Sequence, residues 1–248
     1  MKRHFFSLLI LLLSFASVRA EEFMFKHIEV KDGLPNNSIT AIIKDSKGFM
    51  WIGTASGLTR YDGHNFHVFR NQKNDTLSIP DNYVDFIIED KDENLWMRAG
   101  GEFVLYDLQM ERFVRHPNSY YKKAGVPDKP HYVYVDSEGD YWFYQNWNGC
   151  YYYHRKSGEA QNLMVAEDAL PGSALRGMTE HGDEMILLFD NGEMYGIDKY
   201  SMNITWKDSY LVDGVAGRGA EEFALFKDAE DWLWIYSARG VWVYNLAT

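Results

Sequence analysis

One pattern recurs five times along this chain: an acidic residue is followed six positions later by a large apolar residue. The five copies are Asp45 to Trp51, Asp90 to Trp96, Asp136 to Trp142, Glu180 to Ile186 and Asp228 to Trp234. Successive second members lie 45, 46, 44 and 48 residues apart. A period of about 40 to 50 residues is typical of the four-stranded blades of β-propellers. The repeat therefore predicts an all-β propeller of about five blades.

The residues around each copy alternate as short antiparallel strands require. In the first copy, residues 39–44, 49–53, 57–61 and 65–69 are predicted strands, and Asp62-Gly63 is a hairpin signal. The same pattern places repeats at about 32–69, 82–116, 131–163, 177–207 and 223–248. Aromatic residues make up 16% of the chain, which favours half-buried strands. We expect one domain over residues 21–248.

Closure of the ring has two interpretations. Residues 23–30 resemble a fourth strand, which would complete the last blade and close a ring of five. Alternatively, the chain is the front of a larger ring and a truncated part of a longer protein. The end of the chain after its last strand agrees with both.

The first twenty residues have the layout of a secretory signal. Lys2 and Arg3 precede an apolar run at 5–15, and Val18-Arg19-Ala20 resembles a cleavage site. We expect a signal peptide at 1–20, and an uncleaved membrane anchor is the alternative. After residue 20 no run approaches the roughly 18 apolar residues of a membrane helix, so we expect no membrane contact by the mature chain itself.

The net charge and the cysteine content limit the kinds of partner and of covalent link that are expected. The net charge is −11, and removal of the signal would make the chain more acidic, which disfavours a nucleic-acid partner. Cys150 is the single cysteine, so an internal disulfide cannot form. Its aromatic neighbours indicate a buried, inert thiol.

Neither a catalytic set nor a metal or cofactor site is predicted. The alternating acids of Asp90-Lys91-Asp92 and Asp136-Ser137-Glu138 lack the bidentate Glu of a calcium loop and are interpreted as hairpin turns. The four repeat tryptophans are predicted to pack between blades. Asp85 is the one acidic residue placed on a first strand as a propeller hydrolase would require.

Loops that join second to third strands share one end of a propeller with the loops that join successive blades. Amides, guanidinium groups and an aromatic ring there would suit a hydroxyl-rich ligand. The predicted ligand-binding residues are Asn82, Arg98, Asn146, Trp147, Arg176 and Arg239. Trp147 is distinct from the other tryptophans because it lies outside the repeat position, in a polar loop.

The first repeat resembles a known family. The sequences DGLPNNSI at 32–39, DSKGFMWIGT at 45–54 and GLTRYDG at 57–63 look like the first blade of the two-component regulator propeller. The resemblance is specific over 32–69 and weaker afterwards. It implies the periplasmic sensor region of a hybrid two-component protein, with about seven blades per ring and a kinase that this chain lacks.

The resemblance also implies a function. Its members sense glycan fragments, so we expect an oligosaccharide ligand, no enzymatic activity, and homodimerisation through missing C-terminal regions. Two alternatives stay open. One is a secreted propeller-type glycoside hydrolase or lyase that uses Asp85, and the other is a propeller that binds a protein partner and no small ligand.

Overall fold

The computed structural model describes residues 25–165, 170–209, 211 and 223–246. The predicted signal peptide at 1–20 lies outside these residues. The described strands form five separate antiparallel sheets, four with four strands and one with three. Every sheet pairs its strands in sequence order, so each is a meander. The predicted all-β propeller with five blades is confirmed.

The first two blades are joined by residues 70–83. The first comprises β1 (Ile39–Lys44), β2 (Met50–Thr54), β3 (Gly57–Tyr61) and β4 (Phe66–Phe69). The second comprises β5 (Val84–Glu89), β6 (Asn94–Ala99), β7 (Glu102–Asp107) and β8 (Arg112–Val114). The turn η2 (Val30–Asp32) precedes the first blade.

The remaining blades complete the arc. The third has β9 (Tyr132–Val135), β10 (Tyr141–Gln145), β11 (Gly149–Tyr153) and β12 (Ala160–Met164). The fourth has β13 (Leu175–His181), β14 (Glu184–Phe189), β15 (Met194–Asp198) and β16 (Ile204–Asp208). The fifth has β17 (Ala224–Lys227), β18 (Trp232–Ser237) and β19 (Gly240–Asn245).

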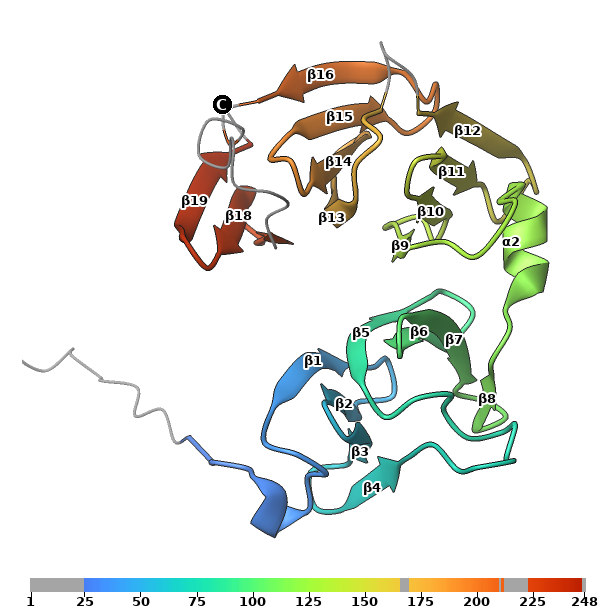
Figure 1. Ribbon diagram of the computed structural model, residues 1–248, viewed down its shortest axis with the longest axis vertical. Helices are drawn as coiled ribbons and strands as arrows, with labels where there is room; N and C mark the ends of the chain where they lie inside the picture. The colour runs from blue at the N-terminus through green and yellow to red at the C-terminus, as the bar shows by residue number, and fades with distance from the viewer. Residues whose placement is uncertain (1–24, 166–169, 210, 212–222, 247–248) are drawn as a thin grey trace, which may run out of the picture.

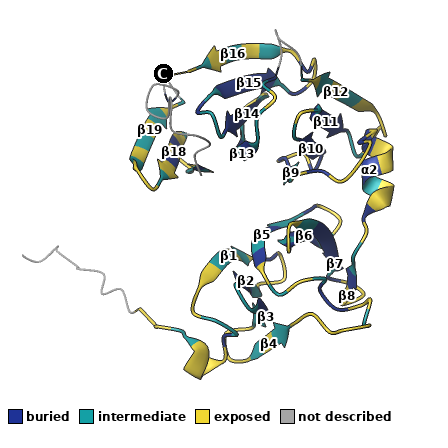
Figure 2. Cartoon of the chain, in the orientation of Figure 1, coloured by how far each residue is buried: buried dark blue, intermediate teal, exposed yellow. Residues whose placement is uncertain are grey.

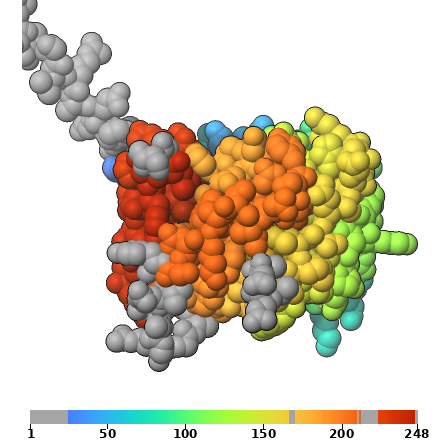
Figure 3. Space-filling view, turned by 90° about the horizontal axis from the view of Figure 1, so that it is seen from above, coloured from blue at the N-terminus to red at the C-terminus, as the bar shows by residue number. Residues whose placement is uncertain are grey.

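The blades are arranged around an arc, with the first and fifth blades at its two ends (Figure 1). Seen from above, the fourth blade lies between the fifth and the third (Figure 3). Residues 25–29 form no strand, and the fifth sheet has three strands within the described chain. The closing strand expected at 23–30 is therefore wrong for its described part.

Apolar side chains fill the spaces between consecutive blades. Four clusters of buried residues each join one blade to the next, and the second and third strands supply most of their members. These strands are dark in the first four blades of Figure 2. In the fifth blade β18 alternates between buried and exposed residues instead. The core therefore holds the sheets face to face, and one face of the last sheet is open.

A short helix, α2 (Asn118–Ala124), lies between the second and third blades and was not predicted. It ends at Gly125, which adopts a left-handed conformation with φ of 73°. Its Tyr121 and Ala124 are buried in the cluster between these blades. The helix thickens the outer rim at the point where Figure 1 shows the second and third blades furthest apart.

The repeated acid and tryptophan are joined by a hydrogen bond. The indole Nε1 donates to the carboxylate at 2.7 Å (Trp51 to Asp45), 3.0 Å (Trp96 to Asp90), 2.9 Å (Trp142 to Asp136) and 2.8 Å (Trp234 to Asp228). The same carboxylates accept backbone N–H groups of their own turns. A spacing of six is thus what lets one carboxylate close the turn and hold the ring on the next strand.

The fourth copy departs from the predicted alignment. In the fourth blade Glu180 pairs with Met185 across the strand ladder. In the second blade the residue that makes the equivalent pair is Glu89, which pairs with Leu95, the residue before Trp96. His181 therefore stands at the position of Asp90, and the turn after it is one residue shorter. The spacing of six residues from Glu180 to Ile186 is a consequence of that shorter turn. The prediction that Glu180 is equivalent to the other repeat acids was therefore wrong.

Candidate functional site

The two ends of the propeller carry different groups. We call the end with the second-to-third-strand hairpins and the blade connections the connecting end, and the opposite end the turn end. Backbone hydrogen bonds anchor each hairpin on the start of its own first strand: Gly100 donates to Tyr83 at 2.9 Å, and Asp190 donates to Ala174 at 2.9 Å. All six predicted ligand-binding residues belong to the connecting end.

Trp147 is the most exposed tryptophan in the described chain, at 69%. It lies at the tip of the hairpin between β10 and β11, which is closed by a bond from Asn148 N to Gln145 O of 3.0 Å. The ring lies beside Gly172 and meets the His131 imidazole edge to face, with centroids 6.4 Å apart. An apolar ring is therefore held at the surface instead of folding into the blade.

The backbone of Trp147 is left-handed, with φ of 60°. Such a conformation costs a bulky residue about 1–2 kcal/mol, and glycine adopts it freely. The hairpin of the second blade places Gly100 and Gly101 at its tip, with φ of 61° and 83°. Strain that persists at an exposed position is characteristic of functional sites.

Replacing Trp147 with glycine should therefore stabilise the hairpin relative to replacing it with alanine. Both changes remove the indole, but only alanine keeps a Cβ in the left-handed conformation. We expect the free energy of unfolding of Trp147→Gly to exceed that of Trp147→Ala by about 1 kcal/mol, measured by urea denaturation. Equal stability of the two variants would contradict strain at this position.

Asn146 precedes Trp147, and its backbone is hydrogen-bonded while its side-chain oxygen is not. Its backbone N–H donates to His131 Nδ1 at 3.2 Å, which fixes the hairpin to the residue that precedes β9. Its side-chain Oδ1 is buried and has no hydrogen-bond partner. The hairpin that carries Trp147 therefore encloses an unsatisfied acceptor.

Arg98 and Asp85 form a two-pronged ion pair at the same end. Arg98 Nε donates to Asp85 Oδ1 at 2.7 Å, and Nη2 donates to Oδ2 at 2.9 Å. Both side chains are partly exposed, at 30% and 25%. This geometry orients the guanidinium plane while leaving its other N–H groups for a ligand.

Tyr132 connects this pair with the fourth blade. Its hydroxyl forms a hydrogen bond with the backbone of Met178 and interacts electrostatically with the charge of Arg98. The centroid of its ring lies 5.7 Å from that of Phe86. Burial raises the pKa of Tyr132, although that hydrogen bond and the arginine charge act in the opposite sense. Tyr132 of the third blade thus contacts both the second and the fourth blade near the connecting end.

Arg176, on the first strand of the fourth blade, is bound less closely to its carboxylate than Arg98 is. Its Nη2 lies 3.9 Å from Asp190 Oδ2, which is longer than a hydrogen bond, and its Nε has no partner. The side chain is 30% exposed. Arg176 therefore keeps most of its donors for another molecule.

Asn82 and Arg239 are the two remaining predicted residues. The Asn82 side chain accepts the backbone N–H of Asn71 at 2.8 Å and fixes the connection between the first two blades. Arg239 lies in the β18–β19 hairpin of the fifth blade, where its backbone N–H donates to Ser237 Oγ at 3.1 Å. The structure places Arg98, Asn146, Trp147 and Arg176 on consecutive blades. Asn82 lies beside the hairpin that follows Arg98, and Arg239 lies on the fifth blade.

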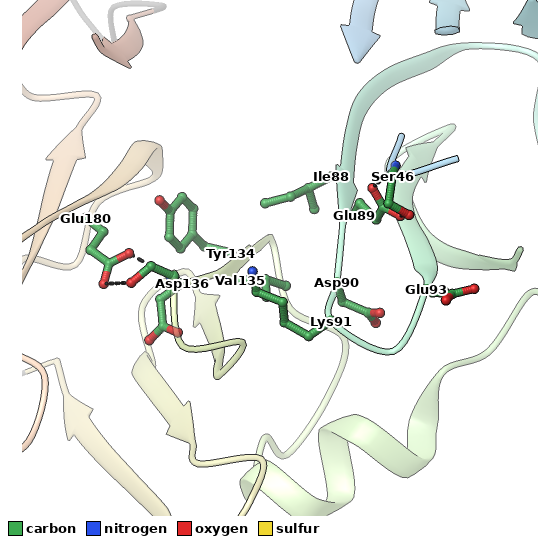
Figure 4. A pocket seen from close by; sticks show the side chains of 11 residues that line it. Ser46, Ile88, Glu89, Asp90, Lys91, Glu93, Tyr134, Val135, Asp136 and Glu180 are labelled. Atoms are coloured by element: carbon green, nitrogen blue, oxygen red, sulfur yellow. Dashed lines mark hydrogen bonds between the residues drawn. The ribbon is translucent and has the colours of Figure 1, made fainter. Parts of the chain in front are cut away.

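The turn end holds a cavity of about 530 Å³ between blades one to four. Its lining is rich in acids and was not predicted as a site. The lining residues are Ser46, Ile88, Glu89, Asp90, Lys91, Glu93, Tyr134, Val135, Asp136, Ser137 and Glu180. Figure 4 shows the carboxylates spread around the cavity, not converging on a single point.

These carboxylates hold neighbouring blades together. Glu89 accepts the backbone N–H of Ser46 at 2.8 Å, and Glu180 accepts that of Ser137 at 2.7 Å, each across a blade boundary. Glu180 also pairs with the buried Lys199. The serine and glutamate are 43 residues apart in both cases, a spacing that could have revealed the contact.

Asp136 at this cavity is buried and accepts three N–H groups. Burial raises its pKa above the ordinary range, while the bond from the Trp142 indole opposes that shift. Its oxygens are therefore occupied by the fold. Among the described residues, no group of three or more His, Cys, Asp or Glu side chains is placed to hold a metal ion.

One set of contacts has the order of a catalytic triad. Ser157 Oγ lies 2.7 Å from His154 Nδ1, and His154 Nε2 lies 3.6 Å from Asp140 Oδ2. However, the backbone N–H of Ser157 donates to the same Nδ1, and Asp140 already accepts from Tyr152 and Arg155. The serine and imidazole close the β11–β12 turn, and Asp140 ties that turn to the strand.

The described helices include none with the length and apolar character needed to cross a membrane. The five meander sheets, packed face to face around an arc, define a β-propeller. Residues 33–56 match the family described as two component regulator propeller. The chain is thus a β-propeller, and part of its first blade matches this family, in agreement with the resemblance predicted there.

Similar proteins agree with this class. Histidine kinase P4 of Formosa agariphila is 36% identical over 74 residues, which cover 28% of this chain and 5% of that protein. The extracellular domain of the putative hybrid two component system BT3049 from B. thetaiotaomicron has a TM-score of 0.67 at 17% identity, over 89% of this chain and 30% of that one. The extracellular domain of the putative system BT4673 has a TM-score of 0.56 at 14% identity, over 86% and 34%.

The chain thus spans about a third of these extracellular domains and a small part of the curated relative. At these identities the solved structures establish the fold.

Proposed function

We propose that this chain is the ligand-sensing propeller of an exported hybrid two-component signalling protein and that it binds glycan-derived oligosaccharides. The observation that carries the proposal is Trp147, an exposed ring held on a strained backbone at the connecting end. Arg98 and Arg176, on the two flanking blades at the same end, offer guanidinium donors. A flat ring with planar hydrogen-bonding groups around it suits a sugar, which has an apolar face and a hydroxylated edge.

The relatives support the signalling half of this proposal. The extracellular domains of two putative hybrid two component systems share the fold, and a histidine kinase shares part of the sequence. In such a protein the propeller would recognise the ligand and other domains would transmit the signal. We therefore place the mature chain in the periplasm, after cleavage of the signal at residue 20.

Titration calorimetry with a panel of neutral and acidic oligosaccharides tests the proposal. We expect one saccharide class to bind, and Trp147→Ala to weaken it by at least about tenfold, or about 1.4 kcal/mol. Tyr200→Ala is the matched control, because Tyr200 is also an exposed aromatic, at 54%, but lies at the turn end. Silence of the folded chain against the whole panel, or equal binding by both variants, would contradict oligosaccharide sensing.

A glycoside hydrolase or lyase is less well supported. Asp85 was the carboxylate that this alternative required, and both of its oxygens accept N–H groups of Arg98. A general acid needs a raised pKa and a free proton to donate to the leaving group. Saccharide turnover by the purified chain that is lost in Asp85→Asn would favour an enzyme instead.

A further inference from the structure

A cavity lies beside helix α2, on the outer rim between the second and third blades (Figure 1). The helix ends at Gly125, and the backbone N–H of Val126 donates to Tyr121 O at 2.9 Å, so the chain turns back and residues 126–129 face the helix. The cavity has a volume of about 460 Å³, which is in the range of small-molecule sites. We call it the α2 cavity. It is lined by Asn118, Tyr121, Lys122, Val126, Pro127, Asp128 and Lys129.

Tyr121 places a fixed hydroxyl at this cavity. The residue is only 6% exposed, and the centroid of its ring lies 5.6 Å from that of Phe143 and 6.3 Å from that of Trp96. Among the described residues its hydroxyl has no hydrogen-bond partner, and the oxygen is not fully enclosed. Burial raises the pKa of Tyr121, and the charge of Glu102 acts in the same sense, so the hydroxyl keeps its proton. It is therefore a donor that the fold leaves for another molecule.

The lining is positively charged although the chain is acidic. Lys122 and Lys129 outnumber Asp128, which gives the lining a net charge of +1 in a chain whose net charge is −11. Lys129 donates to Glu102 at 2.5 Å, outside the lining, and the Asp128 carboxylate accepts the backbone N–H of Lys129 at 2.8 Å. Within the described chain the Lys122 ammonium has no carboxylate partner. One ammonium group is therefore available beside the free hydroxyl.

The nearby guanidinium group is occupied by the fold. Arg115 lines a smaller hollow that shares Tyr121 and Lys129 with the α2 cavity, but it donates to the backbone carbonyls of Ser78 at 2.8 Å and Asp75 at 2.6 Å. A doubly charged phosphate would need more cationic donors than remain, whereas one ammonium and one hydroxyl suit the single charge and two oxygens of a carboxylate.

The wall opposite the helix is partly apolar. Val126 and Pro127 line the α2 cavity between the Tyr121 hydroxyl and the loop that leads to the third blade. Small-molecule sites combine such apolar walls with a few placed polar groups that fix the orientation of the ligand. The lining therefore suits a ligand with one carboxylate and a body that includes apolar atoms.

We propose that the α2 cavity binds a small organic monocarboxylate. The carboxylate oxygens accept the Tyr121 hydroxyl and the Lys122 ammonium, and the rest of the ligand contacts Val126 and Pro127. None of the six residues predicted for the connecting end lines this cavity. The α2 cavity is thus a second site, and it holds whether or not the connecting end binds oligosaccharides.

Titration of the whole chain followed by nuclear magnetic resonance tests this site with two pairs of probes. N-acetyl-leucine is compared with its amide, and glucuronate with glucose, so that each carboxylate has a neutral counterpart. We expect at least one carboxylate to bind with a dissociation constant below about 1 mM, and its neutral counterpart to bind at least about tenfold more weakly. The pair that responds shows whether an amino-acid or a sugar body suits the cavity.

Variants of the lining show where the carboxylate binds. Tyr121→Phe and Lys122→Gln should each weaken binding at least about fivefold, because each removes one donor to a charged group. Lys123→Gln is the matched control: it removes the same charge from the next residue, whose ammonium lies over the Tyr120 ring at 5.8 Å and does not line the cavity. Tyr121→Phe keeps the buried ring and should unfold at the same urea concentration as the wild type.

Three results would overturn the proposal. The first is that neither carboxylate binds the folded chain. The second is that the neutral counterparts bind as tightly as the carboxylates, since the charge would then play no part. The third is equal binding by the Lys122 and Lys123 variants, which would mean that the carboxylate is held elsewhere or only by the general charge of the helix.

Discussion

Replacing Trp96 with alanine is expected to lower the free energy of unfolding by about 3–5 kcal/mol. Its ring is 0% exposed and meets Tyr120, Tyr141 and Phe143 at centroid distances of 5.2, 5.8 and 5.9 Å. The change opens a cavity between the second and third blades and leaves Asp90 without the indole donor. Urea unfolding, followed by both near- and far-ultraviolet circular dichroism, measures the loss.

Trp234→Ala is the matched control for this loss. Trp234 occupies the same repeat position and donates to Asp228 at 2.8 Å, but it is 39% exposed. This variant should lose less than about 1 kcal/mol. If both variants lost the same free energy, the stability would come from the blade itself and not from packing between blades.

The contrast between these two tryptophans shows how far the sequence predicts the fold. The repeat spacing predicted five blades, and 132–135 and 57–61 coincide with strands β9 and β3. The prediction that the repeat tryptophans pack between blades is confirmed for the first three copies and wrong for Trp234. The local pattern at Trp234 is the same as at Trp96, so only the presence of a neighbouring sheet distinguishes them.

Local length changes caused the other errors. In the fourth blade the turn after His181 is one residue shorter, and this moved Glu180 into apparent register with the repeat acids. Helix α2 is too short for an apolar period to reveal it, and Pro117 and Gly125 at its ends were the one signal. Its helical form depends on burial of Tyr121 against the third blade, which is a tertiary contact.

The candidate site was predicted in part because topology fixes which loops share an end. Trp147 stood out since it broke the repeat, and its exposure agrees with that distinction. The bidentate pairing of Arg98 with Asp85 could not be read from the sequence, because it depends on the register of β5 against β6. In the structure Asp85 is therefore the partner that orients Arg98, one of the predicted ligand-binding residues.

The two ends of the propeller use their polar side chains differently. Carboxylates at the turn end are used within turns and across blade boundaries, as with Asp136 and Glu180. Polar atoms at the connecting end keep spare capacity, as with Asn146 Oδ1 and the Arg176 guanidinium. Buried polar groups without a partner are costly, and the described chain leaves others at Thr59 Oγ1 and at Arg155 Nε near the turn end.

Asp136→Ala tests the structural role of the turn end. The carboxylate accepts the Trp142 indole at 2.9 Å and the backbone N–H groups of Glu138 and Asp140 at 3.0 and 2.9 Å. Its removal leaves buried donors without an acceptor, and we expect the free energy of unfolding to fall by about 3 kcal/mol. Denaturant unfolding measures the fall, and calorimetry should show saccharide binding at the connecting end unchanged under conditions where the variant is folded.

Asp228→Ala makes the same change in the fifth blade. Asp228 closes the equivalent turn and accepts the Trp234 indole, but these donors are exposed and water can replace the carboxylate. Its loss of stability should be clearly smaller than that of Asp136→Ala. Loss of ligand binding in the folded Asp136→Ala variant would instead mean that the turn end takes part in recognition, because the carboxylates that hold the blades together would then also hold the ligand.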